Sequence, residues 1–130
     1  MIKDFKGADL LGVEIVPDAV ENARENAKLN NMTNAKFVCG DANSPEITGA
    51  DVIVVDPPRK GCDASLVKKI AEIAPSRVIY VSCNPDTLAR DCKVFYENGY
   101  AVSKAFAADM FSRTGHVESV VCLKRQSDVI

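Results

Sequence analysis

Paired cysteines and an excess of positive charge are both missing from the sequence, and each absence excludes a class of protein. The chain has five cysteines, an odd number, and no C-x-x-C spacing, which argues against a zinc or iron–sulfur site and against a disulfide scaffold. This cysteine usage indicates a reducing, cytoplasmic setting. The formal net charge is −2, so no overall basic field attracts nucleic acid, and any such contact has to be local. The cysteines are Cys39, Cys62, Cys83, Cys92 and Cys122.

Long apolar runs are missing as well. The first seven residues contain no apolar signal core, and no run approaches the length of a membrane span, so no membrane association is expected. No repeat, low-complexity tract or Pro/Gly/Ser linker divides the chain. We therefore expect residues 1–130 to belong to one domain.

What remains is the composition and alternation of an α/β protein. Of the 130 residues, 47% are hydrophobic and 26% are charged, which is typical of a globular domain. Strand patterns alternate with amphipathic helical patterns, except that the last two strands follow one another and are expected to pair antiparallel. The sequence predicts a Rossmann-like, mostly parallel sheet with an antiparallel end. The expected strands are 10–16, 36–39, 51–55, 77–81, 100–107 and 117–124, and the expected helices are 17–30, 63–74 and 86–98.

The stretch RVIYVSCNP, residues 77–85, is the centre of the pattern. Its β-branched and aromatic run predicts a strand buried on both faces, and Pro85 ends that strand. Cys83 then lies where the strand passes into a helix, at the carboxyl edge where α/β sheets bind ligands. A cysteine in such a place is either a small buried apolar residue or a nucleophile.

Acidic residues come at the ends of the other strands. Glu14 lies in a run that is expected to be buried, where an unpaired acid is costly, so we interpret it as an acceptor for ribose hydroxyls. Asp41 either accepts from an adenine amino group or is a turn residue after Gly40. Asp56 opens Asp56-Pro57-Pro58, whose prolines hold the loop rigid. Enzymes that methylate exocyclic amines have a similar motif followed by an aromatic residue, but here Arg59 follows.

These residues resemble a known family, the RNA 5-methyluridine methyltransferases, which use S-adenosylmethionine to methylate C5 of uridine in tRNA or rRNA. The resemblance extends from about Gly12 to Leu123. It rests on Gly12-Val13-Glu14 leading into Ala19-Val20-Glu21-Asn22-Ala23, on Asp56 to Gly61, on Ser82-Cys83-Asn84-Pro85, and on Asp109-Met110-Phe111 followed by Gly115-His116-Val117-Glu118.

The resemblance implies a role for each matching position. Cys83 matches the nucleophile that adds to C6 of the uracil, and Glu118 matches the base that removes the C5 proton. Glu14, Asp41 and Asp56 match cofactor-binding positions, with Asp56 also near the target base. The uridine is expected to flip out of its stack to be reached. The other cysteines match no motif and are interpreted as packing or surface residues.

Basic residues in the matching loops are candidates for RNA contact. Arg59, Lys60 and Arg113 could bind phosphates. His116, the one histidine, either orients a phosphate or the base or is structural.

The chain departs from the family in one respect. The family has a strand with a glycine-rich turn before the Glu14 strand, normally between it and the Asp56 strand, and nothing upstream of Leu10 matches it. The family's amino-terminal RNA-binding part is also unmatched. We therefore expect the carboxy-terminal part of a catalytic domain, inactive or weak alone, which either pairs the Glu14 and Asp56 strands directly or forms a homodimer through exposed strand edges.

Two alternative functions remain open. The chain could be a non-catalytic interaction fragment of the same fold, or a methyltransferase for another acceptor such as cytosine C5.

Overall fold

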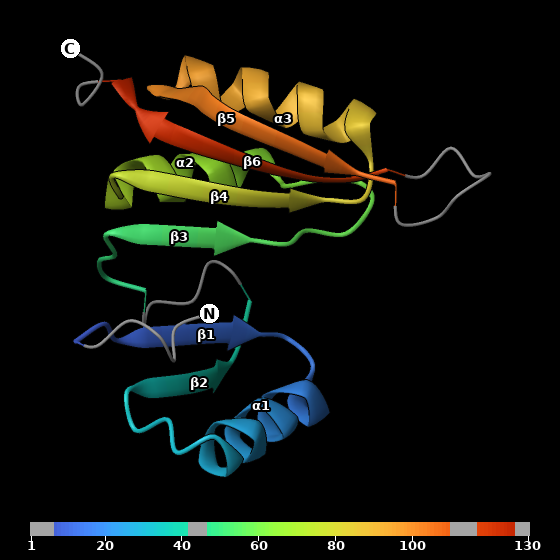
Figure 1. Cartoon of the computed structure of the whole chain (residues 1–130). Coiled ribbons are helices and arrows are strands. Elements are labelled where there is room, and N and C mark those ends of the chain that lie inside the picture. The colour runs from blue at the N-terminus through green and yellow to red at the C-terminus, as the bar shows by residue number, and fades with distance from the viewer. Residues whose placement is uncertain (1–6, 42–46, 110–116, 127–130) are drawn as a thin grey trace. The chain divides into compact units, whose positions relative to one another are not determined.

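The computed structural model describes residues 7–41, 47–109 and 117–126. The described elements follow the predicted order β-α-β-β-α-β-α-β-β (Figure 1). No described helix is long and apolar enough to cross a membrane. The strands are β1 (Leu10–Glu14), β2 (Ala35–Cys39), β3 (Val52–Val55), β4 (Arg77–Ser82), β5 (Tyr100–Ala108) and β6 (Glu118–Arg125), and the helices are α1 (Pro17–Leu29), α2 (Ala64–Ile73) and α3 (Pro85–Glu97).

The chain divides into two compact units, Met1–Ile47 and Thr48–Ile130. In the first unit, β1 and β2 run parallel, from Leu10 opposite Ala35 to Glu14 opposite Cys39, and α1 connects them. Pro17 occupies the first turn of α1, where its missing N–H costs nothing. The helix buries Val20 and Ala27, as expected for the amphipathic pattern of residues 17–30.

The first strand is shorter than predicted. It ends at Glu14 rather than Val16, because the Glu14 carboxylate accepts a hydrogen bond from the Val16 amide at 3.0 Å and the chain turns there into α1. Ile15 is 68% exposed and Glu14 is also exposed, so the predicted burial around Glu14 is wrong.

The second unit contains a four-stranded sheet in the order β3-β4-β6-β5. β3 and β4 are parallel, whereas β6 is antiparallel to both β4 and β5, which confirms the predicted antiparallel end. β1 pairs with β2 and β3 pairs with β4, each within its own unit, and the direct pairing of the Glu14 and Asp56 strands stays a prediction.

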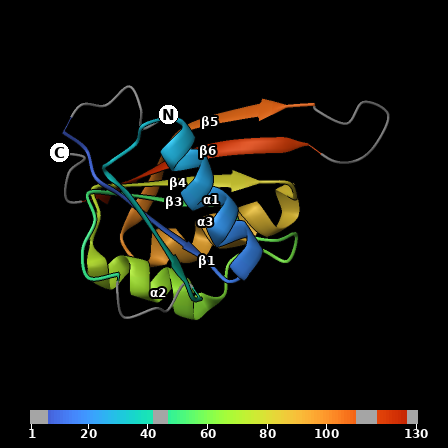
Figure 2. The ribbon, with the colours of Figure 1, turned by 90° about the horizontal axis from the view of Figure 1, so that it is seen from below.

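Helices α2 and α3 cover one face of this sheet (Figure 2). Phe95 of α3 is fully buried, with its ring edge-on to Tyr80 and to Tyr100 at centroid distances of 6.4 and 6.3 Å. The other face is less covered, since Val52 and Val54 are each 49% exposed. Ile79 and Val81 of β4 are half-buried on that face, so the 77–81 strand is fully buried only on the helix-covered face. The apolar core between this face and the two helices includes Val67, Ile70, Val78, Tyr80, Leu88, Phe95, Tyr100, Val121 and Leu123.

Candidate functional site

The end of the four-stranded sheet brings together three of the predicted site residues. In the antiparallel pairing of β4 with β6, Ser82 lies opposite Ser119, and Cys83 and Glu118 are the next residues beyond that pair. Residues opposite one another in such a ladder have Cα atoms about 5 Å apart. Asp56 follows β3 directly, and Val55 lies opposite Tyr80 in the parallel β4. Cys83 and Glu118, the predicted nucleophile and base, are thus neighbours, with Asp56 one strand away.

Each of the three residues adjoins a residue in the rows of the helix-covered face. Val55, Ser82 and Ser119 continue those rows, and Asp56, Cys83 and Glu118 are their neighbours in the chain at the same end of the sheet. Cys83 and Glu118 are half-buried, whereas Asp56 is exposed. A thiol and two carboxylates therefore lie at one end of the four-stranded sheet.

The turn that carries Cys83 is fixed on both sides of the thiol. The Ser82 hydroxyl, 3% exposed, donates to the Asn84 carbonyl at 2.9 Å and accepts from the Asn84 amide at 3.0 Å. The Asn84 side chain accepts from the Asp86 amide at 3.1 Å and so caps α3, while Pro85 opens the helix. Cys83 consequently lies between a buried serine and a capped helix start.

The loop after Asp56 is attached to the same helix. The Arg59 carbonyl accepts from the Asn84 side-chain amide at 3.1 Å and from the Thr87 hydroxyl at 3.0 Å. The Gly61 amide closes a turn on the Pro58 carbonyl at 2.8 Å, and Gly61 has a φ of +83°. Asn84 therefore connects the Cys83 turn with the Asp56 loop, a role that the sequence analysis missed.

The first unit brings the other two predicted residues to one end of its own sheet. Glu14 ends β1, and the Gly40 amide donates to the Glu14 carbonyl at 3.0 Å, directly before Asp41. Both side chains are exposed. One Glu14 oxygen accepts from Val16, and a carboxylate has acceptor capacity beyond that single bond.

The remaining cysteines differ from Cys83 in their surroundings. Burial, together with the nearby Asp91 charge, raises the pKa of the Cys62 thiol to about 11, and burial also raises the pKa of Cys92. Cys39 is exposed and its thiol lies 3.6 Å from the Ile15 carbonyl. These thiols match the packing and surface roles that the sequence predicts for them.

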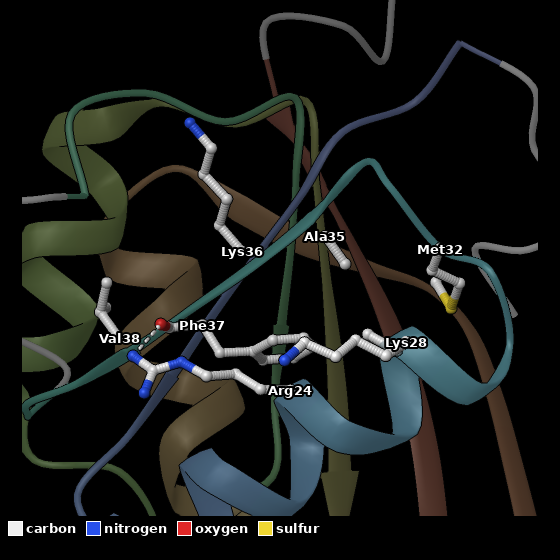
Figure 3. Close-up of a pocket in the computed structure, with 8 residues that line it drawn as sticks. Arg24, Lys28, Met32, Ala35, Lys36, Phe37 and Val38 are labelled. Atoms are coloured by element: carbon white, nitrogen blue, oxygen red, sulfur yellow. Dashed lines mark hydrogen bonds between the residues drawn. The ribbon is translucent and has the colours of Figure 1, made fainter.

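A cavity of about 400 Å³ lies between α1 and β2 and includes none of the predicted site residues. The Arg24 guanidinium reaches from α1 to the Phe37 carbonyl at 3.0 Å, while Lys36 extends away from it (Figure 3). Arg24 also pairs with Glu21, and Lys28 occupies the last turn of α1, where a cation is favourable. Arg24 therefore joins α1 to β2, and Lys28 suits the end of α1.

Some sequence predictions lie outside the described residues, namely those on Met110, Phe111, Arg113, Gly115 and His116. Within the described part of the chain, no group of three His, Cys, Asp or Glu side chains could hold a metal ion.

Comparison with known families gives one match over most of the second unit. The family model described as tRNA (uracil-5-)-methyltransferase matches residues 46–126. A protein of Bacillus cereus named as an uncharacterized RNA methyltransferase is 52% identical over 126 residues, which are 92% of this chain and 27% of that protein. A protein of Halalkalibacterium halodurans with the same description is 50% identical over 119 residues, 87% of this chain and 26% of its own length. The chain thus spans about a quarter of the curated relatives it matches.

Solved structures give the same fold. The tRNA (uracil-54, C5)-methyltransferase of Pyrococcus abyssi, solved with S-adenosyl-L-homocysteine, superposes with a TM-score of 0.81 at 38% identity. The alignment covers 91% of this chain and 29% of that one. A methyltransferase structure from Thermoplasma acidophilum matches with a TM-score of 0.76 at 16% identity, covering 97% and 61% of the two chains, which speaks for the fold alone. The predicted Rossmann-like methyltransferase fold is confirmed.

The two roles of Asn84 can be separated by substitution. Asn84→Ala removes the cap of α3 and the bond to Arg59, and we expect it to lower the free energy of unfolding by about 1–2 kcal/mol in urea titrations. Asn84→Asp keeps the oxygen that caps α3, so we expect a smaller decrease in the free energy of unfolding than for Asn84→Ala.

The matched control is Asn98→Ala, which removes one side-chain bond to the Val94 carbonyl at the other end of α3. We expect a loss of about 0.5 kcal/mol for this exposed bond. Equal losses for Asn84→Ala and Asn98→Ala would show that Asn84 does not hold the turn.

Proposed function

Because the chain belongs to the tRNA (uracil-5-)-methyltransferase family, we propose that it carries the reacting residues for S-adenosylmethionine-dependent methylation of uridine C5 in tRNA or rRNA. The observation that supports this most strongly is the β4–β6 register, which makes Cys83 and Glu118 neighbours. Since the chain spans about a quarter of its relatives, we also propose that residues 1–130 are part of a catalytic domain and weakly active or inactive alone.

Cys83 is the proposed nucleophile. C5 of uracil is too weak a nucleophile to attack a methyl donor, so the thiolate first forms an Sγ–C6 bond and the C5–C6 π pair moves toward C5 and the C4 carbonyl. S-adenosylmethionine supplies, when bound, a sulfonium methyl group that C5 takes while the carbon–sulfur pair stays on the cofactor. A thiol serves here because it ionises more readily than a hydroxyl and departs easily.

Glu118 is the proposed general base. It takes the proton from C5, the C5–H pair re-forms the C5–C6 double bond, and the thiolate leaves C6. This order of events needs the base next to the nucleophile, and the antiparallel ladder supports that placement. Asp56 is the proposed residue near the target base, because its loop is attached to the Cys83 turn through Asn84.

Glu14, Asp41 and Asp56 are the proposed cofactor-binding residues. All three are acids at the carboxyl ends of parallel strands, where nucleotide-type ligands bind. The exposed carboxylate of Glu14 suits the donors of a ribose diol, since its hydrogen bond from the Val16 amide uses part of the acceptor capacity of the carboxylate. The solved Pyrococcus abyssi relative with S-adenosyl-L-homocysteine supports the cofactor class.

RNA is the proposed partner, and Arg59 and Lys60 are its proposed phosphate contacts. Both side chains are exposed in the loop attached to the Cys83 turn. The odd, unpaired cysteines favour a cytoplasmic location for this chemistry.

Covalent trapping tests the proposed nucleophile. RNA containing 5-fluorouridine, incubated with S-adenosylmethionine and the chain, should leave an RNA–protein adduct on denaturing gels, because fluorine at C5 cannot be removed as the proton is. Mass spectrometry should place the adduct on Cys83. We expect Cys83→Ala to abolish the adduct and Glu118→Gln to accumulate one with ordinary uridine RNA.

Cys92→Ala is the control, since Cys92 is a half-buried cysteine on α3 without a proposed role. An adduct that survives Cys83→Ala would contradict the mechanism. Trapping by 5-fluorocytidine RNA in place of the uridine analogue would favour a cytosine acceptor. No adduct with either RNA, from this chain or from a full-length enzyme that contains it, would favour the non-catalytic fragment.

The strand edges support a homodimer as a second proposal about this chain. Among the described strands, β3 pairs with β4 alone, and its Val52 and Val54 are each 49% exposed. An apolar edge strand with unpaired backbone groups is a template for pairing with another copy.

Light scattering tests the dimer. We expect a dimer mass for the unmodified chain and a monomer mass for Val54→Lys, because a lysine on an edge strand opposes pairing. Leu29→Lys is the control, since Leu29 is 75% exposed on α1. A monomer mass for the unmodified chain would overturn the dimer.

A further inference from the structure

Asp91 is a buried carboxylate with no role in the proposed chemistry. It lies on α3, is 2% exposed, and borders the apolar core between α3 and the sheet. A carboxylate out of water is costly unless hydrogen bonds compensate it, so the residue needs a structural or functional reason.

The hydrogen bonds of Asp91 lead to the two segments that carry the candidate site. Its Oδ2 atom accepts from the Tyr80 hydroxyl at 2.6 Å and from the Cys62 amide at 2.7 Å. Tyr80 belongs to β4 shortly before Cys83, and Cys62 ends the loop that begins at Asp56. The Asp91 Oδ2 atom therefore joins β4, which leads to Cys83, to the loop that begins at Asp56.

Arg90 extends the same attachment. Its guanidinium donates to Asp91 Oδ1 from Nε at 3.0 Å and from Nη2 at 2.9 Å, and Nη2 also donates to the Lys60 carbonyl at 2.6 Å. The positive charge compensates the buried carboxylate and binds a second loop carbonyl. Together with the bonds to the Arg59 carbonyl, these contacts hold the loop at residues 59, 60 and 62.

Gly61 shows how closely the loop packs on this pair. A Cβ at that position would lie 2.5 Å from Arg90 Nη2 and 2.5 Å from Asp91 Oδ2. With a φ of +83°, the residue also adopts a backbone conformation that favours glycine. The loop thus presents its bare backbone to Arg90 and Asp91.

We propose that Asp91 is a positioning residue, which holds the loop of residues 59–62 on α3 and thereby fixes Asp56-Pro57-Pro58 relative to Cys83. Reactions that need a ligand between two groups lose rate when either group shifts by about 1 Å. The positioning of the loop follows from the contacts of Asp91, whereas its consequence for the reaction rests on the proposed function.

Two buried tyrosines provide a matched pair of variants. Tyr80→Phe removes the bond to Asp91, and Tyr100→Phe removes a bond of the same length, 2.6 Å, from the Tyr100 hydroxyl to the Pro75 carbonyl. Both residues are almost fully buried, at 0% and 1% exposure. The two variants should therefore lower the urea midpoint similarly, and only Tyr80→Phe should affect the loop.

Hydrogen exchange of the Cys62 amide, measured by NMR under native conditions without RNA or cofactor, tests whether Asp91 holds the loop of residues 59–62 on α3. We expect exchange about tenfold faster in Tyr80→Phe and in Asp91→Asn, and less than twofold faster in Tyr100→Phe. Tyr80→Phe alone decides the result if Asp91→Asn does not fold. Equal exchange at Cys62 in the two tyrosine variants would overturn the proposal.

The same variants test the consequence for the reaction. We expect Tyr80→Phe to slow adduct formation with 5-fluorouridine RNA about tenfold at unchanged RNA affinity, and Tyr100→Phe to leave the rate unchanged. An unchanged rate for Tyr80→Phe would overturn a role of Asp91 in positioning for catalysis. If neither the unmodified chain nor a full-length enzyme that contains it forms an adduct, the proposed function fails, and Cys62 exchange still decides whether Asp91 holds the loop.

Discussion

The register between β4 and β6 is the constraint on which the candidate site depends. Tyr80 lies opposite Val121 and Val78 lies opposite Leu123, and all four residues are buried against α2 and α3. A slip by one residue would move the buried set to the other face, so the core enforces this register. The proximity of Cys83 and Glu118 is thus a consequence of packing in the middle of the sheet.

Hydrogen bonds then fix the two segments that the register brings together, the Cys83 turn and the Asp56 loop. The Ser82 hydroxyl and the Asn84 side chain fix the turn around Cys83, and α3 holds the Asp56 loop through Asn84, Thr87 and Asp91. The same helix therefore supports both the thiol and the acid, while its buried side anchors it to the sheet through Phe95. The polar contacts of α3 and its apolar packing on the sheet therefore both hold the candidate site in place.

Much of this arrangement is predictable from the sequence. The order of elements follows from the alternation of strand and helix patterns, and the antiparallel end follows from the missing helix between residues 100–107 and 117–124. The motifs at Asp56 to Gly61 and Ser82 to Pro85, together with Glu118, lie at one edge of the second sheet. The first strand was misjudged because Ile15 and Val16 look like strand residues, whereas the Glu14 carboxylate turns the chain before them.

The buried network around Asp91 was harder to foresee, although one signal was available. Leu88, Asp91 and Phe95 share the buried side of α3, so the sequence places an acid within an apolar stripe. Its partners come from β4 and from the loop after β3, and such contacts between distant segments depend on a tertiary arrangement that periodicity does not encode.

Titration calorimetry of this chain with S-adenosylmethionine is the most direct test of methyl-transfer chemistry here, because the proposed reaction needs the methyl donor to bind. We predict saturable one-to-one binding that Glu14→Ala abolishes and that Glu25→Ala, an exposed acid on α1, leaves unchanged. Absence of binding by the unmodified chain, or equal binding by Glu14→Ala, would contradict the proposed role of Glu14 and the assignment of cofactor binding to this chain.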